Sequence, residues 1–91
     1  MLLQMDITKL KAFLDANEDC EMLSEGEYVA DLFEGEKPVT VNLKIEKGAC
    51  TVLAAAYLLY DEAQDGWYMG DRIEDESILV NAFEASMRAE A

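Results

Sequence analysis

The chain has 91 residues, of which 52% are hydrophobic, and its 20 acidic and 7 basic side chains give a net charge of −13. This length supports one modest core, and the hydrophobic fraction excludes an acidic disordered tail. The absence of histidine excludes Ser-His-Asp, Cys-His and histidine-ligated zinc sites, so we expect a single globular domain over residues 1–91 that is not an enzyme.

The N-terminal segment "DITKLKAFLDAN" predicts a short amphipathic helix. Asp6 is placed to cap its free backbone N–H groups. The apolar residues that follow recur at helical spacing and form one stripe, made of Ile7, Leu10, Phe13 and Leu14.

Residues 38–46 give the clearest strand pattern, because apolar and polar side chains alternate along them. The preceding segment is ambiguous: Ser24 and Glu27 have capping-box spacing, whereas the apolar residues of 28–32 alternate as in a strand. A strand needs a partner, so we favour a strand at residues 27–34, joined to 38–46 through a turn at 35–38.

The second half of the chain holds one undecided segment and one clear helix. Residues 51–64 fit a helix or a buried strand equally well, since three consecutive alanines favour the first and the apolar run the second. Asp75 is placed to cap a C-terminal helix that buries Leu79, Ala82, Phe83 and Ser86 or Met87. The predicted fold class is therefore α+β, a small antiparallel sheet of about three strands with the N- and C-terminal helices packed on one face.

Location and cofactor use follow from what the chain lacks. The start, "MLLQMD", has neither the basic region nor the apolar stretch of a signal peptide, and the longest apolar run is half a membrane span. Cys20 and Cys50 have no metal-site spacing, so two reduced thiols in a cytoplasm are the simplest interpretation, with a disulfide left open. We expect no cofactor, no catalytic residues and no membrane contact.

The segment "DEAQDGWYMGDR" begins like a calcium loop, with Asp61, Asp65 and Gly66 at positions one, five and six. Positions three and twelve are Ala63 and Arg72, which are not ligands, so we expect no tight calcium site and at most weak binding of divalent ions. We expect a turn at Asp65-Gly66 and no metal site.

The charge map is the most informative feature of the chain. From Asp15 to Glu36 there are nine acidic residues and no basic one, and from Asp61 to Glu76 there are seven with Arg72 alone. Most of these carboxylates have no local Lys or Arg to pair with. We therefore expect one strongly negative region.

That region matches duplex DNA in charge density. Duplex DNA carries one charge per about 1.7 Å, so twenty carboxylates equal about 34 Å of duplex, and a globule of this length is about 30 Å wide. Trp67, Tyr68 and Met69 would anchor the contact if exposed, although packing in the core is the more common fate of such residues. The predicted partner-binding residues are Glu25, Glu27, Asp31, Glu34, Asp61, Glu62, Asp65, Trp67, Tyr68, Asp71 and Glu74.

The expected function is an inhibitor that occupies the basic surface of a nucleic-acid-binding protein or complex without binding nucleic acid itself. In composition alone, the chain resembles the small acidic proteins by which phages and mobile elements block host defence nucleases, including restriction and CRISPR inhibitors. Halophilic acidity would be spread along the chain, whereas here it is clustered. The alternative is a cytoplasmic adaptor or small chaperone that binds through an apolar patch, with charge serving only solubility.

Overall fold

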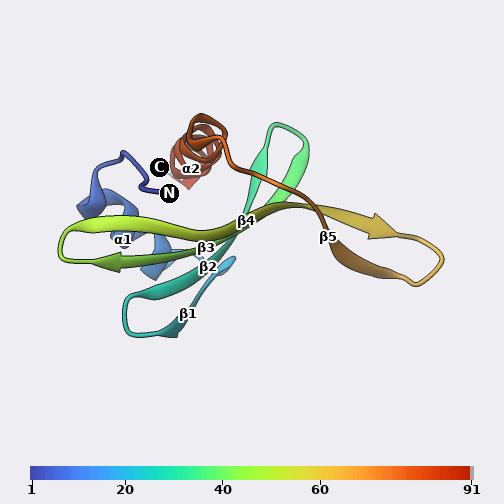
Figure 1. Ribbon diagram of the computed structural model, residues 1–91, viewed down its shortest axis with the longest axis horizontal. Helices are drawn as coiled ribbons and strands as arrows, with labels where there is room; N and C mark the ends of the chain where they lie inside the picture. Colours follow the sequence, from blue (N-terminus) through green and yellow to red (C-terminus); the bar gives the residue numbers. More distant parts are fainter. Residues whose placement is uncertain (91) are drawn as a thin grey trace.

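The computed structural model describes residues 1–90, which form two helices and one five-stranded antiparallel sheet (Figure 1). The elements are α1 (Ile7–Ala16), β1 (Cys20–Ser24), β2 (Glu27–Glu34), β3 (Lys37–Glu46), β4 (Ala49–Asp61), β5 (Gly66–Arg72) and α2 (Glu76–Glu90). The strands lie in the order β1-β2-β3-β4-β5, so each pairs with its neighbour in sequence. The α+β class is confirmed, but the sheet has five strands where about three were predicted.

The central hairpin forms as predicted. β2 and β3 pair in continuous register from Glu27–Lys44 to Glu34–Lys37, around a turn at residues 35–36. The alternation that favoured a strand at 27–34 therefore outweighs the capping-box spacing of Ser24 and Glu27.

The undecided segment 51–64 belongs mostly to β4, which ends at Asp61. Its alternation is hidden by a bulge: Asn42 pairs with Ala54 and Leu43 with Val52, so Leu53 is an extra residue on β4. The bulge shifts the inward positions by one residue, from Val52 to Ala55. The alanines of this strand thus follow sheet geometry despite their helix propensity.

The core lies on one face of the sheet, under both helices. Inward residues of the strands, among them Tyr28, Val41 and Leu43, join the apolar stripes of α1 and α2 in one buried cluster. Phe13 of α1 and Phe83 of α2 meet edge to face, with ring centroids 6.4 Å apart. Both helices therefore pack on the same face, as their stripes predicted.

The predicted caps hold both helices at their N-termini. The Asp6 carboxylate accepts a hydrogen bond from the Lys9 N–H at 3.2 Å, and the Asp75 carboxylate accepts one from the Ser77 N–H at 2.9 Å. In α2, Leu79, Ala82 and Phe83 are buried, and of the two alternatives that follow, Met87 packs against the core.

A polar contact ties α1 to the sheet. The buried Tyr28 donates its hydroxyl hydrogen bond to Asp15 Oδ1 at 2.9 Å, and Lys11 Nζ lies 2.7 Å from Asp15 Oδ2. The hydrogen bonds from Lys11 and Tyr28 lower the pKa of Asp15, because both stabilise its charged form.

Cys20 is half-buried and Cys50 is buried, and no disulfide joins them. No helix within residues 1–90 is long and apolar enough to cross a membrane.

Candidate functional site

A two-stranded arm projects from the sheet. The pairing of β3 with β4 ends at Val39–Tyr57, whereas β4 continues to Asp61 and pairs there only with β5. Residues 58–69, called the arm here, form the hairpin on the right of Figure 1. The arm lengthens the molecule to 43 × 26 × 24 Å, so it is not the 30 Å globule expected from chain length.

One face of the sheet, called the outer face here, carries no helix. On the arm, the pairs Leu58–Met69 and Tyr60–Trp67 point to this face. Phe33 and Pro38, which pair across β2 and β3, point to it as well. The outer face therefore concentrates apolar side chains next to the arm.

The aromatic and methionine side chains of this face are exposed to solvent, whereas Pro38 and Leu58 are half-buried. Trp67 is 61% exposed, Met69 62% and Phe33 59%. A groove of about 420 Å³ runs between the arm and the body of the sheet and is lined by Asp31, Phe33, Pro38, Thr40, Leu58 and Trp67. Core packing of the Trp-Tyr-Met triplet, the commoner fate by sequence, is therefore wrong.

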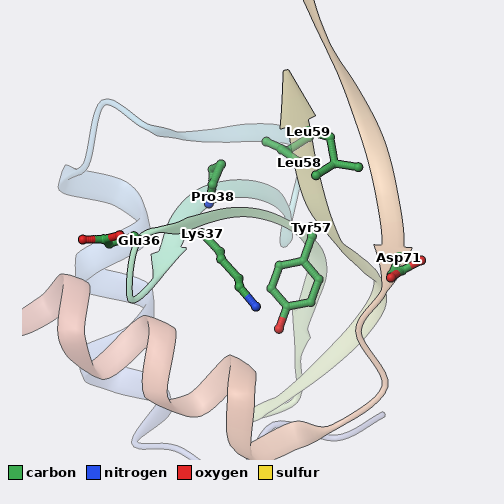
Figure 2. A pocket seen from close by; sticks show the side chains of 7 residues that line it. All are labelled: Glu36, Lys37, Pro38, Tyr57, Leu58, Leu59 and Asp71. Carbon is green, nitrogen blue, oxygen red and sulfur yellow. The ribbon is translucent and has the colours of Figure 1, made fainter. Parts of the chain in front are cut away.

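A second hollow lies where β4 leaves β3 (Figure 2). It measures about 380 Å³, and its floor includes Tyr57 and Leu59, with Glu36 and Asp71 at opposite sides. Lys37 Nζ lies 5.4 Å from the centroid of the Tyr57 ring, a cation–π distance. The chain thus places its own cation on an aromatic face between two carboxylates.

A bulge shapes the base of the arm. Ala56 pairs with Arg72 but Leu58 with Met69, so Gly70 and Asp71 together oppose Tyr57. A Cβ at Gly70 would lie 2.9 Å from Leu59 Cδ1 and 3.3 Å from the Tyr57 carbonyl oxygen. A larger residue at position 70 would therefore have to displace the Leu59 side chain.

The tip of the arm is held by its aromatic residues. Tyr60 and Trp67 meet edge to face, with centroids 5.2 Å apart, and the Tyr60 hydroxyl donates a hydrogen bond to Asp65. That hydrogen bond raises the pKa of Tyr60, because the neutral phenol is the donor. The Asp61 carboxylate accepts from the Ala63 N–H at 2.9 Å and closes the turn.

The predicted carboxylates do not form one continuous patch. In this antiparallel order, the β1–β2 turn lies at one end of the sheet, and the β2–β3 and β4–β5 turns lie at the other. At the arm end of the sheet lie Asp61, Glu62 and Asp65, at the tip of the arm, Asp71, at its base, and Glu34, beside the β2–β3 turn, but the β2–β3 hairpin diverges from the arm (Figure 1). Glu25 and Glu27 lie at the opposite end, Asp31 lies in the groove, and Glu74 follows β5.

The arm-end carboxylates lack cationic partners. The described side chains, those of residues 1–89, form three ion pairs, Lys11–Asp15, Lys44–Glu46 and Arg88–Glu84, and none includes a predicted partner-binding residue. No group of three or more metal-ligating side chains is present in the same range. The arm and groove thus offer aromatic faces, apolar area and uncompensated carboxylates, which are the means of binding a macromolecule.

The sequence indicated Trp67, Tyr68 and Met69 as contact candidates, but Phe33 and Leu58 were missed. Phe33 could have been found from the sequence, since it is out of phase with the inward Tyr28 and Leu32 on β2. Leu58 could not, because its place on the outer face depends on the arm. The chain matches no family model, no curated protein and no solved structure.

Proposed function

We propose that this protein is a non-enzymatic acidic binding protein that occupies the basic, nucleic-acid-binding surface of a partner protein. One observation supports the proposal above the others: an arm with exposed Trp67 and Met69 stands beside carboxylates that have no cationic partner in residues 1–89. Aromatic anchors surrounded by charge are typical of surfaces that bind proteins.

The charge contributes through many weak contacts. An exposed ion pair contributes only about 0–1 kcal/mol, so several arm-end carboxylates must act together to compete with a phosphate backbone. Clustered charge also accelerates association with an oppositely charged surface. A basic groove that accepts duplex DNA, with one charge per about 1.7 Å, fits an acidic body 43 Å long.

A second function is favoured by a different observation. The groove on the outer face is lined mainly by apolar side chains, including Phe33, Pro38 and Leu58. An adaptor or small chaperone that binds an apolar segment would use this groove and would need the charge only for solubility. The two functions differ in salt response, because screening weakens charge pairs and leaves apolar contacts almost unchanged.

The test uses two variants of identical net charge. In the arm-end variant, Glu36→Lys in the β2–β3 turn, Glu62→Lys at the tip of the arm and Asp71→Lys at its base reverse three exposed charges. In the β1-edge variant, Glu18→Lys before β1, Glu21→Lys on β1 and Glu25→Lys after it reverse three exposed charges at the opposite edge of the sheet. Three reversals of two charges each change −13 to −7 in both variants. A difference between them therefore reports position and not total charge.

Partners captured from host lysate at about 50 and 300 mM salt are identified, purified and assayed for binding to their own nucleic acid. We expect the wild type to block that binding and to lose at least tenfold in affinity at the higher salt. The arm-end variant should lose inhibition, and the β1-edge variant should keep it. Equal inhibition by both folded variants with a flat salt response contradicts this function and supports the adaptor.

A further inference from the structure

The edge of β5 is open for strand pairing. β5 is the last strand of the sheet, and its 7 residues pair only with β4 among the strands of residues 1–90. Natural edge strands are commonly protected by charged residues, proline, a bulge or a covering element. β5, "GWYMGDR", has neither lysine nor proline, and its bulge and charged residues lie at one end, at residues 70–72, so residues 66–69 carry none of these devices. Trp67, Tyr68 and Met69 are all exposed along it.

The two faces of this edge differ in chemistry. Trp67 and Met69 point to the outer face, beside the apolar groove. Tyr68 pairs with Leu59 and points to the other face, where Asp71 and Glu36, with Lys37 as the one cation, line the hollow of Figure 2. Successive side chains of an added strand point to opposite faces, so the strand that fits alternates apolar residues with basic ones.

Charge decides between a second copy of this chain and a foreign strand. Two copies paired along β5 would bring two bodies of net charge −13 together, and the seam would hold Asp65 and Asp71 of each copy with Arg72 as the one cation of the strand. Like charges opposed across strands destabilise a pair, whereas a basic strand would be attracted to the same carboxylates. The surface therefore fits a cationic occupant.

We propose that the partner adds an extended strand of alternating basic and apolar residues to the β5 edge, with its apolar side chains against Trp67 and Met69 and its basic side chains toward Tyr68 and Asp71. This inference rests on the proposed function in one respect, that the partner is a basic protein. It adds the contact element and the mode of recognition. Main-chain hydrogen bonds would supply affinity, and the alternation would supply specificity.

The probe is the peptide Ac-Arg-Val-Arg-Val-Arg-Val-Arg-Val-NH2, and the reporter is Trp67, the only tryptophan of the chain. We expect saturable binding with a blue shift of the Trp67 emission, because the added strand buries an indole that is 61% exposed. A peptide of the same composition with four arginines followed by four valines should bind at least tenfold more weakly. Met69→Ala and Asp71→Lys should each weaken the alternating peptide, and Leu23→Ala, an exposed apolar site on β1, should not.

Backbone methylation separates strand pairing from simple charge attraction. The backbone amides of every second residue point to the same side of a strand, so in the bound peptide either the valine amides or the arginine amides face β5. N-methylation of the set that faces β5 should abolish strand pairing, and N-methylation of the other set should not. One methylated peptide should bind like the parent and the other should lose at least tenfold. Equal binding of both methylated peptides, equal binding of the block peptide, or no binding at all overturns the inference.

The failure of this inference is distinct from failure of the proposed function. If the peptides fail while the arm-end charge variant still loses inhibition of the captured partner, the partner binds the acidic surface without adding a strand. If the peptides behave as expected while no nucleic-acid-binding partner is inhibited, the edge binds basic strands in another context. Peptide-free dimerisation measured by sedimentation would show instead that a second copy occupies the edge.

Discussion

Replacement of the buried Cys50 with alanine should change how stability depends on alkaline pH. Cys50 is 1% exposed, and burial raises its pKa from the ordinary 9.0 to about 11. Between these values the unfolded chain loses the thiol proton while the folded chain keeps it, so the folded state loses stability as the pH rises. A pKa difference of two units corresponds to about 2.7 kcal/mol of folding stability, of which the folded state loses about 2 kcal/mol between pH 8 and pH 11.

At pH 8, Cys50→Ala should destabilise the fold by about 1 kcal/mol, because a small buried group is removed. At pH 11 the variant should be the more stable protein, since it avoids the larger alkaline loss. Urea unfolding followed by circular dichroism at the two pH values measures both differences. Val52→Ala, a core truncation on the same strand without a titrating group, should be destabilised equally at both. An alkaline loss in Cys50→Ala equal to that of the wild type would refute the reasoning.

Three further predictions concern the core, a turn and the arm. Phe83→Ala should lower the free energy of unfolding by about 3–5 kcal/mol. A double-mutant cycle with Phe13→Ala, measured by urea unfolding, should give a coupling energy of about 1 kcal/mol, whereas additive losses of stability would exclude the edge-to-face contact. Gly26→Ala should cost about 1–3 kcal/mol, and more than Gly48→Ala, because both have positive φ but only at Gly26 would the Cβ meet a backbone atom, the Ile45 oxygen at 2.7 Å. Near the pI of about 4.1 the net charge vanishes, so the chain should self-associate in sedimentation experiments, and Trp67→Ala should reduce this association. A chain that stays monomeric at this pH would show that charge repulsion is not what prevents association through the arm.

The sequence correctly predicted the helices and strands that bury one face in the core and expose the other to solvent. The stripes of α1 and α2 and the alternation of β2 and β3 each record a boundary between core and solvent. The caps Asp6 and Asp75 were equally readable, because the capping side chain and the helix it serves are adjacent in sequence.

The parts that sequence did not predict have no such boundary. The bulge at Leu53 breaks the alternation of β4, and β5 carries three apolar residues in succession because the arm exposes both of its faces. The candidate site was mispredicted for the same reason. Two acidic segments predicted one negative patch, whereas the turns of the antiparallel sheet place Glu25 and Asp65 at opposite ends of the sheet. Charge is a property of the composition, but its arrangement is a property of the topology.

The excess charge and the exposed arm belong to one physical problem. An edge strand with exposed aromatic residues tends to pair with its own copies, and proteins usually prevent this by covering the edge or placing lysine on it. Here the body carries a net charge of −13, and repulsion between copies opposes pairing at β5 without blocking the edge itself. Under the proposed function, a basic partner would be attracted where a second copy is repelled, so the same carboxylates would select the partner and keep copies of the free protein apart. The proposal would thus account for a charge beyond what solubility requires, a magnitude of about 2–8 for a domain of this size.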